Sequence, residues 1–163
     1  MFYPEYDLDV LLRRRPDALA FVHGSSRHPT ILGTVSFYQT ERGVIVVADV
    51  SGLPFHAAEK CEANAFFAFH IHSGGACTGT EADPFANVMG HYNPDQCPHP
   101  NHSGDLPPLL SNQGHAFSAV LTDRFTVKEI IGRTVVIHGS PDDFVTQPSG
   151  NAGEKIACGV IRP

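Results

Sequence analysis

The feature that most limits how this chain can fold is a stretch of about 40 residues, 73–114, that shows neither helical nor strand periodicity. The stretch is rich in Gly, Pro, Asn and Asp, and it contains His91, His99 and His102. Connections longer than about 15 residues are uncommon in compact domains, and they are usually functional or disordered. Because histidine is a metal ligand, a bound metal ion is a natural way to order this one. A second irregular stretch covers 139–155.

Outside these two stretches, short runs of β-branched and aromatic residues alternate with turn residues, which is typical of antiparallel β proteins. Strands are predicted at 19–23, 32–39, 44–50, 66–72, 116–121, 134–137 and 156–161. Residues 41–43 end in glycine and predict a hairpin turn between the second and third strands. No segment has a convincing 3.6-residue period, and only one short helical turn is expected, within 53–64.

Length and composition favour one globular domain. We expect residues 1–163 to form it, with 1–17 as an N-terminal extension. The hydrophobic content of 42% is in the globular range, and the net charge of −6 argues against a sequence-independent grip on nucleic acid. No apolar run approaches the ~20 residues that span a bilayer, so no membrane association is expected. Residues 1–12 lack the pattern of a secretory signal. We therefore expect a cytoplasmic protein, with an exported form whose leader has been left out as the alternative.

The pair His70 and His72 lies in the predicted strand 66–72. Residues two apart in a strand point to the same face, so both rings can reach one metal ion while Ile71 points to the core. Two solvated histidines on an exposed face are the alternative for this pair taken alone. His138 ends another apolar run, and by itself it would be interpreted as a satisfied core histidine.

In the stretch 73–114, the three histidines His91, His99 and His102 are followed by Asp105. Three nitrogen donors and one carboxylate suit a tetrahedral zinc site. Ordinary loop histidines near a turn are the alternative. The spacing therefore predicts a zinc site that folds this stretch back on itself.

Several sequence blocks taken together resemble the copper–zinc superoxide dismutases. In chain order, the blocks are FHIH at 69–72, GHYNP at 90–94, HSGDL at 102–106, GRTVVIH at 132–138, the pair Asp142 and Asp143, and GNAGEKIACGVI at 150–161. The similarity is clear over 66–161 and weaker over 18–53. It implies an all-β, eight-stranded antiparallel Greek-key barrel or immunoglobulin-like sandwich with two long active-site loops, an architecture for which these enzymes are themselves a known example.

Carried over residue by residue, the resemblance implies two metal sites. The copper ligands would be His70, His72, His91 and His138. The zinc ligands would be His91, His99, His102 and Asp105. The shared residue, His91, would bridge the two metals. Asp142 matches a carboxylate that links His70 to His99 and fixes the tautomers of both rings.

The four cysteines are Cys61, Cys77, Cys97 and Cys158, and spacing alone does not choose among their three pairings. The resemblance matches Cys77 and Cys158 to a disulfide that ties the metal-binding loop to the last strand. Two buried thiols are the alternative. Cys61 and Cys97 have no counterpart. The segment 54–65, which carries His56 and Cys61, is longer than in common relatives and has no assigned function.

The sequence departs from the family pattern at Lys155, where the family has an arginine beside copper. Lysine keeps the positive charge but loses the planar fork of donors, so a reduced activity is expected. The alternative is an ordinary solvated lysine that does not face copper. Residues 139–154 contain no Lys or Arg. Attraction of an anion would then depend on a cation elsewhere, such as Arg124 or Lys128, and we expect a lower on-rate.

The resemblance implies an enzyme that converts superoxide to dioxygen and hydrogen peroxide with copper and zinc as cofactors. Copper would supply the redox step, His91 would supply a proton, Lys155 would attract superoxide, and zinc would have a structural role. The alternative is a catalytically weak or inactive copper- and zinc-binding relative that acts in metal buffering or as a chaperone. A homodimer and a monomer are both compatible with the family.

Overall fold

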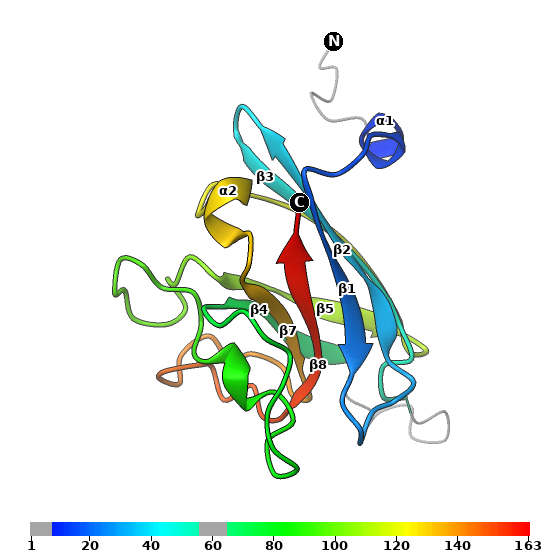
Figure 1. The fold of residues 1–163 in the computed structure, drawn as a ribbon, viewed down its shortest axis with the longest axis vertical. Helices are drawn as coiled ribbons and strands as arrows, with labels where there is room; N and C mark the ends of the chain where they lie inside the picture. The colour runs from blue at the N-terminus through cyan, green and yellow to red at the C-terminus, as the bar shows by residue number, and fades with distance from the viewer. Residues whose placement is uncertain (1–7, 56–64) are drawn as a thin grey trace.

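The computed structural model describes residues 8–55 and 65–163, where eight antiparallel strands close into a barrel (Figure 1). The strands are β1 Ala18–Gly24, β2 Leu32–Thr40, β3 Gly43–Ser51, β4 Phe66–His72, β5 Asp105–Asn112, β6 His115–Thr122, β7 Thr134–His138 and β8 Lys155–Arg162. Around the barrel they follow the order β1-β2-β3-β6-β5-β4-β7-β8. The chain passes between non-neighbouring strands after β3 and after β6, as in a Greek key. The expected eight-stranded β-barrel is confirmed.

The hairpin of β2 and β3 shows how the local sequence sets the register. Thr40 pairs with Gly43, so Glu41 and Arg42 form a two-residue loop inside the predicted turn. Gly43 has a φ of +135°, and a Cβ there would lie 2.3 Å from the carbonyl oxygen of Thr122 on β6. Glycine is the residue that meets both demands, because it lacks a Cβ and tolerates positive φ.

Alternate residues of each strand fill the interior of the barrel. Phe37 from β2 and Ile137 from β7 are fully buried and belong to one apolar cluster that spans the barrel. Ile71 on β4 belongs to the same cluster and is also fully buried. Its neighbours His70 and His72 are therefore turned to the opposite, outer face of β4. Core packing thus aims both histidines toward the long loops.

The two long connections lie side by side outside the barrel, next to β4 and β7 (Figure 1). Residues 73–104 join β4 to β5, and residues 139–154 join β7 to β8. The amide of Gln147 ties them together, because its Nε2 donates to the carbonyl of His99 (2.7 Å) and its Oε1 accepts from the backbone N–H of His99 (3.0 Å). The loops cover the outer face of β4 so completely that His70 is 0% exposed.

The prediction of one loop over 73–114 was wrong at its end, because residues 105–112 form β5. Pro107 and Pro108 lie inside this strand, and prolines argue against a strand because they have no N–H to donate. The structure accommodates them where the β4–β5 ladder shifts register, between Phe67 and Phe69 of β4. This irregular strand is the element that carries Asp105.

Three short helices also went unpredicted, because they are too short to show a period: α1 Leu8–Arg13, the 3-10 helix η1 Ala86–Val88 and α2 Val127–Ile130. Leu11 of α1 packs against Tyr38, Ile45 and Val47 on the outside of the barrel. Of the expected turn within 53–64, residues 53–55 are irregular and the rest lies outside the described residues. Within 8–55 and 65–163, no helix has the length and apolar character to cross a membrane. That 1–163 is one domain stays a prediction.

Candidate metal centre

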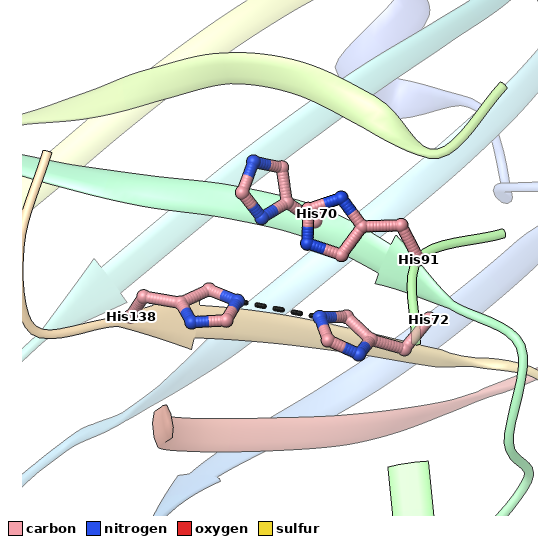
Figure 2. A group of neighbouring side chains, drawn as sticks. All are labelled: His70, His72, His91 and His138. Carbon is pink, nitrogen blue, oxygen red and sulfur yellow. Dashed lines mark hydrogen bonds between the residues drawn. The ribbon is translucent and has the colours of Figure 1, made fainter. Parts of the chain in front are cut away.

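The first cluster of donor atoms is the four-histidine group: His70, His72, His91 and His138. His70 and His72 come from β4, and His138 comes from the end of the neighbouring strand β7. His91 arrives from the connection 73–104, where it forms a β-bridge with His72. Figure 2 shows the four rings facing one another. One nitrogen from each ring lies within 4.8 Å of the corresponding nitrogen in the others.

The second cluster is the mixed group: His91, His99, His102 and Asp105. Asp105 begins β5, and the three histidines precede it in the connection 73–104. Their donor atoms also lie within 4.8 Å of one another. Asp105 forms a hydrogen bond with one of them, from Nδ1 of His91 to Oδ1 (2.7 Å), and its Oδ2 lies 3.0 Å from Nδ1 of His99. His91 is the member that the two groups share.

Hydrogen bonds on the outside of the four-histidine group fix which nitrogen faces inward. Nδ1 of His72 donates to the carbonyl of Met89 (2.8 Å), and Nδ1 of His138 lies 3.4 Å from the carbonyl of Gly153. In that tautomer each Nε2 carries a lone pair, and the two Nε2 atoms lie only 3.2 Å apart (Figure 2). Two lone pairs at this distance repel unless a cation or a proton lies between them.

The remaining donor atoms also fit a cation. Nδ1 of His70 and Nε2 of His91 are buried and have no hydrogen-bond partner. Nδ1 of His99 is likewise buried, and its approach to Asp105 lacks hydrogen-bond geometry. Buried polar atoms are almost always paired, so unpaired nitrogens within the two donor groups indicate a ligand in each group. The two groups therefore fit metal ions. One group has four imidazoles, and the other has three imidazoles and a carboxylate, so the two groups suit different metals.

Asp142 joins the two groups from behind. Its Oδ2 accepts from Nε2 of His70 (2.8 Å) and its Oδ1 accepts from Nε2 of His99 (2.9 Å). The carboxylate therefore fixes both rings with Nε2 protonated and Nδ1 free to bind metal. The sequence predicted these two partners, and the structure brings them together.

Burial keeps His70, His72 and His138 neutral. Burial, followed by the charge of His91 and the other rings, lowers the pKa of His70 far below its usual range. Burial also lowers the pKa of His72 well below 6.5 and that of His138 to about 4, and the positive charge of Lys155 contributes to both shifts. Neutral imidazole is the form that binds a metal ion. The group is thus ready for a cation at neutral pH.

The carboxylate of Asp105 stays ionised although it is partly buried. Burial opposes its ionisation, but the hydrogen bond from His91 and the charges of His91 and His102 outweigh this effect and lower its pKa. An ionised carboxylate is what the mixed group needs to bind a divalent cation.

Lys155 begins β8 and pairs in register with His138. Its side chain is 20% exposed, and its Nζ forms an ion pair with Asp83 at 2.5 Å. Nζ also lies 3.4 Å from the carbonyl oxygen of Phe85. The lysine is therefore neither freely solvated nor unpaired, and the sequence did not predict its partner Asp83.

The predicted disulfide between Cys77 and Cys158 is present. Its sulfurs join an apolar cluster with Phe85, Val88 and Val136, which anchors η1 against β7 and β8. Cys97 is a partly buried free thiol that belongs to neither donor group. Cys61 and His56 lie outside the described residues.

The contacts that three residues make at the centre escaped sequence reasoning. Gln147 holds the backbone of His99, as described above, and Asp83 pairs with Lys155. Arg124, expected as a steering cation, instead donates Nη1 to the carbonyls of Pro100 (3.0 Å) and His102 (3.2 Å). It thus organises the mixed group from the outside. Such contacts join residues that are distant in the sequence, so no local sequence pattern predicts them.

Comparison with known proteins agrees with this geometry. Residues 31–161 match the family model described as copper/zinc superoxide dismutase. A Cu-Zn superoxide dismutase from Schizosaccharomyces pombe is 37% identical over 158 residues, which cover 88% of this chain and 96% of that protein. Cu-Zn superoxide dismutase 1 from Aquifex aeolicus is 35% identical over 146 residues, which cover 80% of each.

A solved structure supports the fold. The Cu/Zn superoxide dismutase from Brucella abortus superposes with a TM-score of 0.72 at 24% identity, and the match covers 88% of this chain and 99% of that one. The match of the family model over most of the chain, together with relatives above 30% identity, leaves one assignment. This chain belongs to the copper/zinc superoxide dismutase family.

Proposed function

We propose that this protein converts superoxide to dioxygen and hydrogen peroxide at a copper–zinc centre. The observation that carries the proposal is the position of His91, whose ring is shared by two clusters of donor atoms with different chemistry. The four-histidine group suits copper, and the mixed group suits zinc. When bound, copper supplies one-electron oxidation and reduction, while zinc supplies a fixed charge without redox chemistry.

In this proposal each residue has a defined task. The copper site consists of His70, His72, His91 and His138. The zinc site consists of His91, His99, His102 and Asp105. Asp142 orients one ring in each site through the hydrogen bonds at 2.8 and 2.9 Å, and the disulfide of Cys77 and Cys158 stiffens the neighbouring loop.

The proton chemistry falls to His91. Two superoxide anions and two protons give one dioxygen and one hydrogen peroxide, so protons must reach the site. Nε2 of His91 is buried and unpartnered, and it faces the four-histidine group. Nδ1 lies on the other side of the ring, 2.7 Å from Asp105 in the mixed group, where a zinc ion would hold it. With one nitrogen fixed, the ring can hold and release a proton at Nε2 without reorienting.

Lys155 supplies positive charge for the substrate. Superoxide is a monovalent anion, and the ammonium group of Lys155 lies close enough to His72 and His138 for its charge to act on both. The lysine attracts the anion to the copper site but holds it with a point charge instead of a planar fork. The expected result is catalysis at a reduced rate.

A second candidate function is a copper- and zinc-binding relative with little or no turnover. The ion pair of Lys155 with Asp83 favours it, because the cation beside the four-histidine group is already neutralised. The absence of Lys and Arg from residues 139–154 also favours this function, because that loop has no cation to attract superoxide.

Stopped-flow decay of superoxide separates the two functions. The protein is loaded with one copper and one zinc, and a chelator removes loose copper. We expect a fast, chelator-resistant decay that His91→Gln abolishes. His115→Gln, which removes an exposed histidine outside both groups, should leave the rate unchanged. A background rate with both metals bound would contradict the dismutase and favour the binding protein.

The oligomeric state and the compartment are further proposals. An exposed apolar row supports a homodimer: Phe66 (51% exposed) pairs with Leu110 (48%), and Phe117 (47%) lies on the adjacent strand β6. Leu110→Lys should then convert a dimer to a monomer in sedimentation velocity. The cytoplasmic location is tested by fractionating cells that express the natural gene, and recovery outside the cytoplasm would favour the exported alternative.

A further inference from the structure

The cation beside the four-histidine group carries its own counterion. Nζ of Lys155 lies 2.5 Å from Oδ2 of Asp83, whose side chain is 45% exposed. Asp83 belongs to the connection 73–104, whereas Lys155 begins β8. The pair therefore ties the metal-binding loop to the last strand, and the carboxylate offsets part of the positive charge that Lys155 offers to an approaching anion.

Asp83 is fixed in this position by its surroundings. Its Oδ1 accepts from the backbone N–H of Phe85 (3.2 Å), and its own N–H donates to the hydroxyl of Thr80 (3.1 Å). Phe85 is 2% exposed and anchored in the apolar cluster around Cys158. The carboxylate is thus part of an ordered turn, unlike most surface ion pairs between two flexible side chains.

A second ion pair holds the same two segments together. Arg27 pairs with Glu154, the residue before Lys155, at 2.6 Å. The same guanidinium donates to the carbonyls of Glu81 (2.8 Å) and Ala82 (3.0 Å), the two residues before Asp83. Arg27 therefore fixes the position of the backbone next to Lys155 and next to Asp83.

Few of the cations in residues 8–55 and 65–163 are placed to replace the charge that Asp83 offsets. Lys155 pairs in register with His138, a member of the four-histidine group. Residues 139–154, the other loop beside the site, contain no Lys or Arg. Arg124 is occupied with backbone carbonyls of the mixed group.

We propose that Asp83 is a built-in brake on anion capture, which neutralises Lys155 and so lowers the attraction of the copper site for superoxide and for every other small monovalent anion. Asp83 is a positioning residue that acts through Lys155 and takes no part in the electron or proton transfer. The inference rests on the proposed copper–zinc function. It predicts that removal of one carboxylate makes the protein a stronger anion binder.

The test is Asp83→Asn, which keeps the oxygen that accepts from Phe85 and removes the charge. Azide serves as the probe: its affinity for the copper- and zinc-loaded protein is measured by absorbance titration at low ionic strength, and superoxide decay is measured in parallel. We expect azide to bind about twofold more tightly, the factor for a unit charge roughly 10 Å from an anion in water. The superoxide rate should rise by a similar factor, and the gain should disappear at high salt.

Asp49→Asn is the matched control. Asp49 is also an exposed carboxylate with a close partner, His115 at 2.8 Å, but it lies on β3, opposite β7 in the ring of strands. It changes the net charge equally and should leave azide affinity and rate unaltered. Unchanged or weaker azide binding in Asp83→Asn at full metal content would overturn the proposal that Asp83 weakens anion binding.

If Asp83→Asn does not load both metals, Asp83→Ser, which also retains an oxygen acceptor, takes its place. Failure of both variants to load would show that Asp83 is needed for the structure of the loop and would likewise overturn the proposal. A natural protein that binds azide but does not turn over superoxide contradicts the proposed function instead, so the two failures are distinguishable.

Discussion

Nε2 of His70 donates to Oδ2 of Asp142 at 2.8 Å, and both side chains are at most 1% exposed. The other carboxylate oxygen accepts from His99, so one buried anion sets the ring orientation in both donor groups. An amide cannot do the same, because it has one acceptor oxygen and its nitrogen is a donor.

Asp142→Asn should therefore lower metal affinity by about 10- to 100-fold, the usual effect of losing a carboxylate behind a metal-ligating histidine. Competition with a chelating dye measures the affinity for zinc and for copper. Asp143→Asn is the control, since Asp143 is exposed and accepts hydrogen bonds from Thr146 within its own turn. Equal affinities in the natural protein and Asp142→Asn would contradict this role.

The folded metal-free protein should lose stability as the pH falls. The pKa of His138 is lowered by burial to about 4, below its unfolded value of 6.5. The stability due to the neutral ring is thus fully present above pH 6.5 and is lost as the pH falls toward 4. This residue alone accounts for about 3 kcal/mol at the acid end.

Urea unfolding at several pH values measures this loss. His138→Gln should show a pH dependence smaller by about one proton over the same window. A metal-free protein whose free energy of unfolding stays constant from pH 7 to 5 would refute the assignment of neutral, buried histidines.

Loss of the disulfide should destabilise the protein strongly. Cys77 and Cys158 are separated by 81 residues, and closing a loop of that length in the unfolded chain corresponds to about 4 kcal/mol in the chain-entropy model. The variant with both cysteines changed to alanine should unfold at clearly lower urea concentration. Cys97→Ala, which removes a free thiol, should change the free energy by about 1 kcal/mol or less. Matching midpoints for the three proteins would contradict a structural role.

Lys155→Gln should slow superoxide decay in the loaded protein. A unit charge in contact with an anion in water, about 4 Å away, is worth about 1 kcal/mol, so we expect the rate to fall by up to roughly fivefold. Lys155→Arg should retain the natural rate or exceed it. Arg42→Gln removes an exposed cation from the turn between β2 and β3 and serves as the control. A rate that does not respond to Lys155→Gln would mean that the lysine does not act on the substrate.

Much of this structure could be predicted from the sequence because its strongest signals are local. Alternation in 32–39 and the short glycine-containing turn before 44–50 predicted a hairpin whose strands run nearly as expected. The spacing of His70 and His72 predicted two rings on one face of a strand, and the core position of Ile71 explains why they point outward. Motif order then added the remaining ligand candidates, which the structure brings into two clusters.

What could not be predicted depends on contacts between distant residues. β5 was missed because Pro107 and Pro108 argue against a strand, and only the shifted register with β4 makes them tolerable. Asp83 lies 72 positions from Lys155, and nothing in its local sequence distinguishes it from a surface carboxylate. The hydrogen bond between Gln147 and the backbone of His99 joins residues 48 positions apart, and no local sequence pattern predicts it either.

The ring of His91 lies in both donor groups, and this has a thermodynamic consequence. An ion on one side fixes the tautomer and orientation of a ligand that the other side also needs. The two metal equilibria are therefore linked, and linkage is reciprocal: whatever factor zinc contributes to copper affinity, copper must contribute to zinc affinity. The centre is expected to fill cooperatively, so that at limiting metal a mixture of fully loaded and empty molecules outnumbers half-loaded ones.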